Sequence, residues 1–464
     1  MSRRLVWAFL LAMLAGLPAR AQTPFASDLV PTRTALSRLG LERQWMAVIP
    51  VVGDERVLSV SMSDNLIFVQ TNKAYFHTMD AETGQVLWTA RLGSQTAKAQ
   101  GASVNSFGVF VTNLNTLFAL DRKTGHTIWT EALLGTLPSS STACDEDRVM
   151  VGLANGKIYG YALKERINKE TTQTKVSDHA VEVWNWQTSG PVMTRPLPAA
   201  RVVAFGSNDG KVYVAFADER TMLYRIATGG AIGAGLGSFG PRLLLIPSED
   251  RILYAVDILT SEVKWTFPSG SPIAQEPLVA NDDIFMVNTS GEISSIDPKN
   301  GSARWTTRTQ GGRMMCVGAK KVYLESDNGD LFIINRENGQ MIVSPRASLE
   351  RAGLNIRNFD LGTTNRINDR LYLATSSGML ICVREIGQTK PRLLRDPKAI
   401  PFGTVPAEGV SLTPPPTVVA PPEEKAAETT PAAEKPAAEV PAPAPKPEKP
   451  PAGDTAPPPA ENPK

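Results

Sequence analysis

Histidine and cysteine, which can bind a metal or act as a base or nucleophile, are few in this sequence, and its 46 acidic residues are scattered. The 464 residues include only three histidines, His77, His126 and His179, and three cysteines. No histidine stands with cysteine or carboxylate residues at metal-ligand spacing, so the sequence predicts no zinc site. The Gly-x-Ser-x-Gly motif of a serine nucleophile is also missing. We therefore expect no catalytic residues, no metal and no cofactor.

Two stretches have compositions that also occur at ligand sites. A glycine-rich stretch runs from Gly229 to Gly237, and an acidic run occupies residues 145–147. A phosphate-binding glycine loop leads into a helix, whereas this stretch joins two β units, so we interpret it as a connection between them. The acidic run fits a solvated turn, and spacing alone selects no acid–base pair.

A repeated phrase, Asp-x-x-Thr-Gly-x-x-x-Trp, organises most of the chain. It is intact at 80–88 and 121–129, and worn copies follow. Such a period indicates one supersecondary unit copied many times. We expect Asp and Thr to bond turn backbone, Gly to supply a positive φ, and Trp to pack against the next unit. These structural positions are Trp45, Asp80, Gly84, Trp88, Asp121, Gly125, Trp129, Asp257, Trp265, Asp297, Gly301, Trp305 and Gly339.

The phrase follows two alternating strand-like runs joined by a polar turn. Eight such hairpins can be placed, and most are spaced by about forty residues, which is typical of four-stranded propeller blades. We predict an all-β, eight-bladed β-propeller of four-stranded antiparallel blades, with seven blades as the alternative. The hairpins are Leu66–Asp80, Gly108–Asp121, Arg148–Ala162, Val202–Ala217, Leu243–Asp257, Asp283–Asp297, Lys321–Asn335 and Arg370–Arg384.

Closure of the ring can be predicted from its two ends. The segment Arg43–Pro50 contains Trp45 and looks like an outer strand, but no inner hairpin precedes it. The last hairpin, which ends near Arg384, has no Trp strand after it. We therefore expect the N-terminal strand to complete the last blade, so that pairing of the two chain ends closes the ring.

Composition divides the chain into five segments. Residues 1–21 have the positive start, short apolar core and small-residue cleavage site of an export signal. Residues 413–464 contain 17 of the 36 prolines and mostly Ala, Glu and Lys besides, a composition that predicts a disordered tail. The segments are 1–21 (signal peptide), 22–43 (lead-in with a short helix over 31–39), 44–390 (propeller), 391–412 (linker) and 413–464 (tail).

The export signal indicates where the protein is located, and the net charge limits the kinds of partner that it can bind. The signal predicts an exported protein, periplasmic or otherwise associated with the cell envelope, with no membrane span after cleavage. No cysteine lies near the cleavage site, so we expect no lipid anchor. The net charge is only +2 and no basic cluster stands out, which excludes nucleic-acid binding. We expect a monomer.

The three cysteines, Cys144, Cys316 and Cys382, are too few for a disulfide framework. Cys316 and Cys382 stand in strand-like apolar runs, where we expect buried free thiols. One disulfide remains an alternative at this point.

The repeated phrase resembles the repeat of pyrroloquinoline quinone (PQQ) dehydrogenases and their non-enzymatic relatives, over roughly Trp45 to Arg384. Among those relatives, an exported eight-bladed propeller of this size is similar to BamB-type scaffolds of the outer-membrane β-barrel assembly machinery. The resemblance implies a non-catalytic scaffold whose partners are envelope proteins, including β-barrel assembly components. The chain departs from that pattern because it lacks a lipid-accepting cysteine and has a long Pro-rich tail.

Two alternatives and one candidate surface complete the expectations. A PQQ-dependent dehydrogenase is the enzymatic alternative, but the methanol-type members carry an adjacent cysteine pair, and here the cysteines are far apart. A propeller that binds glycans or another envelope ligand is the second. For partner binding we single out the polar insertion 164–178 and the following Trp184 and Trp186, because exposed aromatic residues can anchor interfaces. Alternatively, one or both tryptophans pack inside the blade.

Overall fold

The computed structural model describes residues 30–96, 98–167, 173–309 and 311–404. The predicted signal peptide and the Pro-rich tail lie outside these residues. Among the residues described, no helix is long and apolar enough to cross a membrane.

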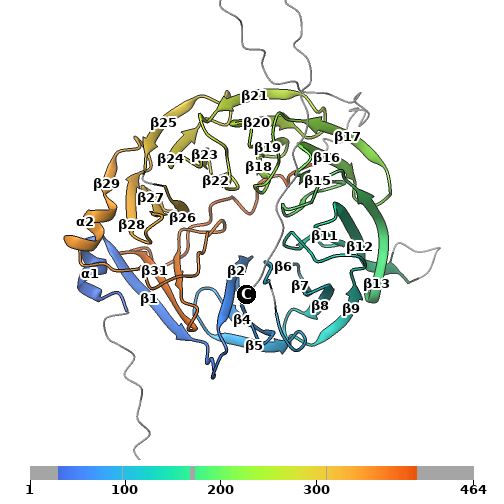
Figure 1. Ribbon diagram of the computed structural model, residues 1–464, viewed down its shortest axis with the longest axis horizontal. Helices are drawn as coiled ribbons and strands as arrows, with labels where there is room; N and C mark the ends of the chain where they lie inside the picture. The colour runs from blue at the N-terminus through green and yellow to red at the C-terminus, as the bar shows by residue number, and fades with distance from the viewer. Residues whose placement is uncertain (1–29, 97, 168–172, 310, 405–464) are drawn as a thin grey trace, which may run out of the picture. The chain divides into compact units, whose positions relative to one another are not determined.

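Eight antiparallel sheets stand around a common centre (Figure 1), which confirms the predicted eight-bladed propeller. Seven sheets have four strands. The eighth has three, and an isolated bridge between Leu361 and Ala374 stands beside them. The connection that leads into this blade therefore pairs at one point instead of forming a full innermost strand.

The blades are numbered along the chain, and their strands are given from the centre outwards. Blade 1 consists of β2 (Val57–Ser63), β3 (Leu66–Thr71), β4 (Tyr75–Asp80) and β5 (Val86–Arg91), and blade 2 of β6 (Ser103–Val104), β7 (Gly108–Asn113), β8 (Thr116–Asp121) and β9 (Thr127–Ala132). Blade 3 consists of β10 (Ala143–Cys144), β11 (Arg148–Gly152), β12 (Lys157–Arg166) and β13 (Thr174–Gln187), and blade 4 of β14 (Leu197–Ala199), β15 (Val202–Ser207), β16 (Lys211–Phe216) and β17 (Met222–Ala227). Blade 5 consists of β18 (Gly237–Phe239), β19 (Leu243–Pro247), β20 (Ile252–Asp257) and β21 (Val263–Pro268), and blade 6 of β22 (Leu278–Ala280), β23 (Asp283–Val287), β24 (Glu292–Ile296) and β25 (Ala303–Arg308). Blade 7 consists of β26 (Arg313–Val317), β27 (Lys321–Glu325), β28 (Leu331–Asn335) and β29 (Met341–Val343), and blade 8 of β30 (Leu371–Ala374), β31 (Met379–Glu385) and β1 (Leu41–Val48).

The burial of the strands explains their sequences. The second strands of blades 1, 2 and 4 are buried at every position, because each lies between two neighbouring blades, and they are correspondingly rich in apolar residues. The outermost strands face a neighbour on one side only. In β5, Trp88 alone is buried, and its flanking residues are exposed.

A β-bulge recurs on the outermost strand of all eight blades, one residue before the Trp position. In blade 1, Trp88 pairs with Thr78 and Val86 with Met79, so Leu87 is the extra residue. The same shift occurs in the other seven blades. A bulge bends its strand and increases the local twist, so it directs the Trp side chain towards the next blade.

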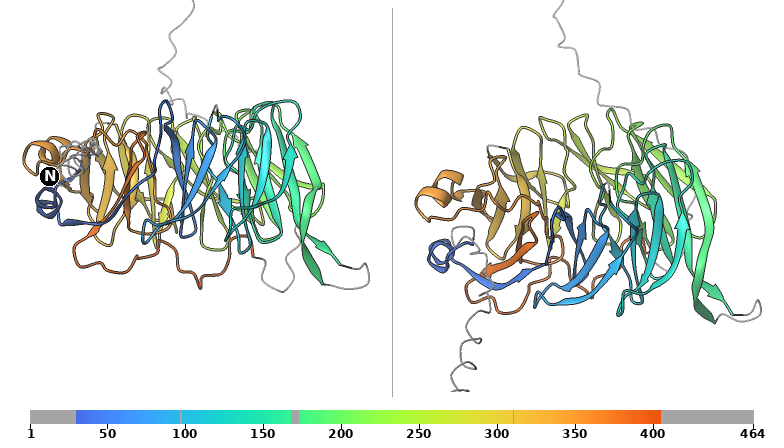
Figure 2. Two further views of the ribbon diagram at one scale, coloured as in Figure 1. Left: turned by 90° about the horizontal axis from the view of Figure 1, so that it is seen from below. Right: turned by 60° about the horizontal axis from the view of Figure 1, so that its bottom comes forward.

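The two chain ends close the ring as predicted. β1 pairs antiparallel with β31, from Leu41 opposite Glu385 to Val48 opposite Met379. Two short helices, α1 (Arg33–Arg38) and α2 (Pro345–Glu350), lie side by side at the rim near this seam (Figures 1 and 2). Arg38 Nη1 donates to the carbonyl of Arg351 at 3.4 Å, directly after α2.

Residues 388–404, which we call the strap, run from blade 8 across the centre of the ring (Figure 1), along one of its two faces (Figure 2, left). Leu394 is buried, and its amide donates to the carbonyl of Ile367 at 2.9 Å. Gly403 N donates to Pro241 O at 2.7 Å. The described part of the segment that the sequence predicted as a linker is therefore packed against the propeller.

Candidate functional site

The aspartates of the repeated phrase are occupied by their own turns. Asp121 Oδ1 accepts hydrogen bonds from Lys123 N at 3.0 Å and from both N and Oγ1 of Thr124 at 2.8 Å. The Thr124 hydroxyl is the main reason why the pKa of Asp121 is lowered. Asp80 makes the same contacts in its turn, and Asp257 and Asp297 also accept bonds from the amide two residues on. These carboxylates hold turns and are not free for acid–base chemistry.

The Trp and Gly of the phrase meet between successive copies. The indole of Trp88, in blade 1, covers Gly125, in blade 2, and a Cβ at Gly125 would clash with Trp88 Cε3. Trp88 Nε1 donates to the carbonyl of Arg122 at 2.9 Å, in the same turn. Three further pairs repeat this contact, namely Trp45 with Gly84, Trp265 with Gly301 and Trp305 with Gly339. Each glycine also has a φ near +73°, so the position needs glycine for two reasons.

Other blades keep the inter-blade contact with altered residues. Blade 4 has Tyr224 at the Trp position, and its hydroxyl donates to Ile258 O of the next blade at 2.5 Å. Trp129 is buried among blade 3 residues and lies against Phe110, with ring centroids 6.5 Å apart. Degenerate copies of the phrase therefore keep the packing contact between neighbouring blades even where the motif residues are replaced.

Trp184 and Trp186 both pack towards blade 4 on one face of β13. Trp184 is 1% exposed, and its Nε1 donates to Ala217 O at 2.9 Å. It is the packing tryptophan of blade 3, which agrees with the alternative that one of the pair packs inside the blade. Trp186 is half-buried under the guanidinium of Arg220, 5.7 Å from the ring centroid, and of the pair it alone retains an accessible surface.

The insertion extends the outer hairpin of blade 3. Pairing continues from Lys164 opposite Val176 to Arg166 opposite Thr174, past the edge of the neighbouring strands on the side of the strap (Figure 2, left). It brings His179 close to two carboxylates, with Nδ1 2.9 Å from Asp178 Oδ1 and 3.4 Å from Glu165 Oε1. In the described part of the chain this is the one group that could supply three metal ligands. Since it is largely exposed and His179 is already hydrogen-bonded to Asp178, we assign it no metal.

The pKa values of His77 and His179 are expected to be shifted in opposite directions from that of an ordinary histidine. The hydrogen bond to Asp178, with Glu165 nearby, raises the pKa of His179, whereas burial lowers the pKa of His77. An NMR pH titration should therefore show His77 losing its proton at lower pH than His179. Asp178→Asn should lower the His179 midpoint and leave His77 unchanged. Coinciding midpoints would contradict this assignment.

The lowered pKa of His77 also gives the fold a pH dependence. Between its folded and unfolded pKa values, the unfolded chain binds more protons, so this residue's contribution to stability falls as the pH drops through that range. His77 is 9% exposed, and its Nδ1 lies 2.8 Å from Thr89 Oγ1.

The cysteines are three free thiols. Burial raises the pKa of Cys144 and of Cys382 to about 12, and it raises the pKa of Cys316 well above its ordinary value. At neutral pH these groups are protonated, and a protonated thiol is a poor nucleophile and metal ligand.

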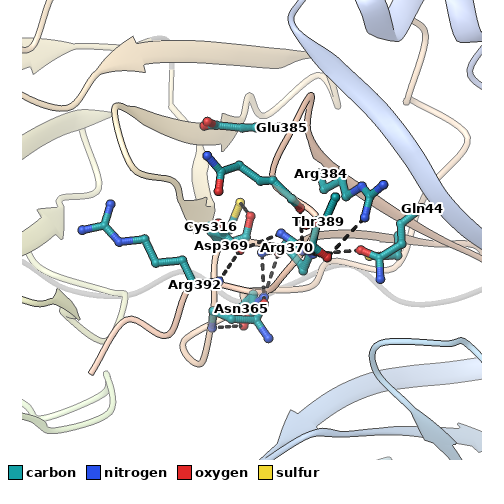
Figure 3. Close-up of polar contacts among 12 residues, drawn as sticks. Gln44, Cys316, Asn365, Asp369, Arg370, Arg384, Glu385, Thr389 and Arg392 are labelled. Atoms are coloured by element: carbon teal, nitrogen blue, oxygen red, sulfur yellow. Dashed lines mark hydrogen bonds and ion pairs between the residues drawn. The ribbon is translucent and has the colours of Figure 1, made fainter. Parts of the chain in front are cut away.

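A buried polar network joins the two ends of the ring (Figure 3). Its centre is Arg370, which is 1% exposed. Its Nε donates to Gln44 Oε1 in β1 at 2.8 Å, its Nη1 to Asp369 Oδ1 at 2.8 Å, and its Nη2 to Gln388 O at 2.9 Å. Gln44 is the bulge residue of β1. One guanidinium thus fastens the first strand, the last hairpin and the start of the strap.

Comparison with known proteins identifies the family. The family described as outer membrane protein assembly factor BamB matches residues 29–229 and 200–412, which together span the whole ring. The chain belongs to this family. A search of curated proteins found no match.

Two solved structures show the same fold. The crystal structure of BamB from Moraxella catarrhalis is 16% identical, with a TM-score of 0.59 over 75% of this chain and 98% of that one. The computationally designed Ika8 protein is 14% identical, with a TM-score of 0.50 over 71% of this chain and 96% of that one. The likeness to a designed protein underlines that this architecture by itself specifies no activity.

Exposed apolar side chains stand on two neighbouring connections between blades, on the face opposite the motif turns. Leu134 is 73% exposed, Leu137 50% and Met193 38%. Leu134 and Leu137 belong to the connection β9–β10, and Met193 belongs to the connection β13–β14. Both connections contact Leu153: Pro138 of the first forms a β-bridge with it, and Val192 N of the second donates a hydrogen bond to its carbonyl at 3.2 Å. We call Leu134, Leu137 and Met193 the loop patch. Sequence reasoning missed it, because isolated apolar loop residues become a surface only when two blades stand side by side.

Proposed function

We propose that this chain is a non-catalytic, exported scaffold that binds other proteins of the cell envelope through the loop patch. Its membership of the BamB family supports a scaffold role in general, and the patch is the observation that carries the specific surface. In line with the sequence, we propose that the mature protein is monomeric and not lipidated.

Physical reasons favour the loop patch as a contact surface. Single exposed apolar residues are ordinary on protein surfaces, but groups of them on neighbouring loops mark interaction sites. A rigid frame that carries variable loops is also a common way to build a binding face. Trp186, on the outer edge of blade 3, is a secondary candidate for contact with the same partner.

Substitution of the loop patch is expected to reduce partner capture strongly without unfolding the ring. The variant Leu134→Ser, Leu137→Ser, Met193→Ser removes apolar contact area, and loss of interface anchors of this kind weakens binding about tenfold or more. Crosslinking in cells, followed by identification of the co-purified proteins, measures the effect. Since the three side chains are exposed, the variant should melt close to the parent protein.

A matched control is available on the outer strand of blade 1. Val86 and Leu87 are 46% and 50% exposed, so Val86→Ser, Leu87→Ser changes similar apolar area at another site. Recovery of a β-barrel assembly subunit by the parent and the control, but not by the loop-patch variant, would support an assembly role. Equal capture by all three proteins would rule out the loop patch. If purified protein gained a chromophore and alcohol oxidation after incubation with PQQ and calcium, the non-catalytic assignment would be wrong.

A further inference from the structure

The centre of the ring contains a cavity of about 240 Å³ with an unusual concentration of guanidinium groups. Arg195 precedes β14, Arg366 lies in the connection before β30, and Arg395 belongs to the strap. All three line the cavity, together with two carboxylates, Glu276, which precedes β22, and Asp64, which follows β2. Residues 171 positions apart in the sequence, from 195 to 366, thus meet around one space.

Glu276 neutralises only part of this charge. Its Oε1 lies 3.3 Å from Arg366 Nε and 3.8 Å from Arg195 Nη2. Asp64 also lines the cavity, but it pairs at 2.5 Å with Arg122 from outside the lining. The three arginines therefore keep an excess of positive charge.

Arg395 is the least compensated of the three. Its Nη1 donates to Ser238 Oγ at 3.0 Å and its Nη2 to Ser238 O at 2.9 Å, and both acceptors are neutral. No carboxylate among the described residues forms an ion pair with it. Burial lowers the pKa values of Arg366 and Arg395, while Glu276 opposes and Arg195 adds to the effect. Guanidinium groups nevertheless stay protonated in proteins, and the side chains of Arg195 and Arg366 are 42% and 38% exposed, so the positive charge of the site is accessible to a ligand from solvent.

The cavity is built into the fold. A Cβ at Gly235 would lie 2.5 Å from Glu276 Oε2, so the glycine-rich connection leaves the room that this carboxylate occupies. The strap crosses the ring to place Arg395, and the hydroxyl groups of Ser63, Ser238 and Thr364 add hydrogen-bonding groups to the lining.

We propose that the central cavity binds a small anion that carries carboxylate or phosphate groups. Guanidinium groups form two parallel hydrogen bonds with either group, and three of them converge here. The volume suits a small molecule and is too small for a folded segment of a partner. The site goes beyond the scaffold role and does not depend on it, since binding can be measured on the isolated protein.

The proposal is tested by calorimetric titration of the full chain with inorganic phosphate and, separately, with succinate. Sodium chloride at matched ionic strength controls for general salt effects. Saturable binding of phosphate or succinate is expected, and the tighter of the two identifies the source of the acidic group. The double variant Arg366→Gln, Arg395→Gln should weaken it about tenfold or more.

A second variant guards against loss of folding. Glu276→Gln removes the competing carboxylate and keeps the side-chain shape, so it should tighten anion binding about threefold or more, a gain that misfolding cannot produce. Arg308→Gln, at an 89% exposed side chain on β25, is the matched control and should bind like the parent. Absence of saturable binding of both anions, or unchanged affinity in the two cavity variants, would overturn the proposal.

Discussion

Replacement of Arg370 by methionine is expected to destabilise the protein by about 3–5 kcal/mol, because it removes one partner of a buried ion pair. The side chains of Arg370 and Asp369 are 1% and 3% exposed. Without the guanidinium, the Asp369 carboxylate keeps the amide of Arg392, at 3.0 Å, as its one hydrogen-bond donor among the described residues. Gln44 Oε1 in β1 would also lose the hydrogen bond from Arg370 Nε. Denaturant unfolding of parent and variant measures the difference.

The matched control is another arginine at the same seam. Arg384 pairs with Glu42 at 2.8 Å, but the two side chains are 22% and 40% exposed, so Arg384→Met should cost only about 0–1 kcal/mol. Hydrogen exchange adds a local test, since Arg370→Met should increase the amide exchange rate in β1 more than in the strands of blades 1 to 7. If the two variants unfold at the same denaturant concentration, Arg370 does not fasten the ring.

Replacement of Gly125 by alanine is expected to cost about 2–5 kcal/mol, the sum of two penalties. A left-handed backbone with φ +73° costs about 1–2 kcal/mol in an alanine. Overpacking against the Trp88 ring, which the new Cβ would overlap, costs about 1–3 kcal/mol more. Thermal and denaturant unfolding report the total.

Gly53 separates the two penalties. It has a φ of +65°, and a Cβ added there would meet no atom within 4 Å, so Gly53→Ala should carry only the backbone cost of about 1–2 kcal/mol. In a Trp88→Ala background, Gly125→Ala should fall to the same cost, because the two residues are coupled through one contact. An equal effect of Gly125→Ala in both backgrounds would show that the Trp88 ring can move aside.

Much of the frame could be predicted from the sequence because blade hairpins are local. The turns that join the second and third strands are marked by pairs such as Asn155-Gly156 and Ser377-Gly378, and their glycines have φ values of +83° and +92°. The missing hairpin before Trp45 and the missing Trp strand after the last hairpin were enough to predict the pairing of β1 with β31.

The details of packing were less accessible. The phrase contains both Trp and Gly, but nothing in one copy shows that its Trp covers the glycine of the next. The bulge before each Trp was also missed, since strand register depends on the partner strand. Side chains two positions apart on a strand lie on the same face, so the sequence allowed burial of both Trp184 and Trp186. Only the packing of blade 4 against that face shows that Trp184 is the one buried completely.

By itself, the sequence determined the repeat and the turn chemistry, and it correctly favoured eight blades over seven and a ring closed by its two ends. Each of these depends on residues within about forty positions of one another, or on which half-blade is missing at each end. The tertiary structure alone decided the contacts at the seam and at the centre. Gln44 and Arg370 are 326 positions apart, and Arg195, Arg366 and Arg395 come from separate connections that only the closed ring brings together. No local pattern records such contacts, because their energies depend on groups that approach only after the blades have packed.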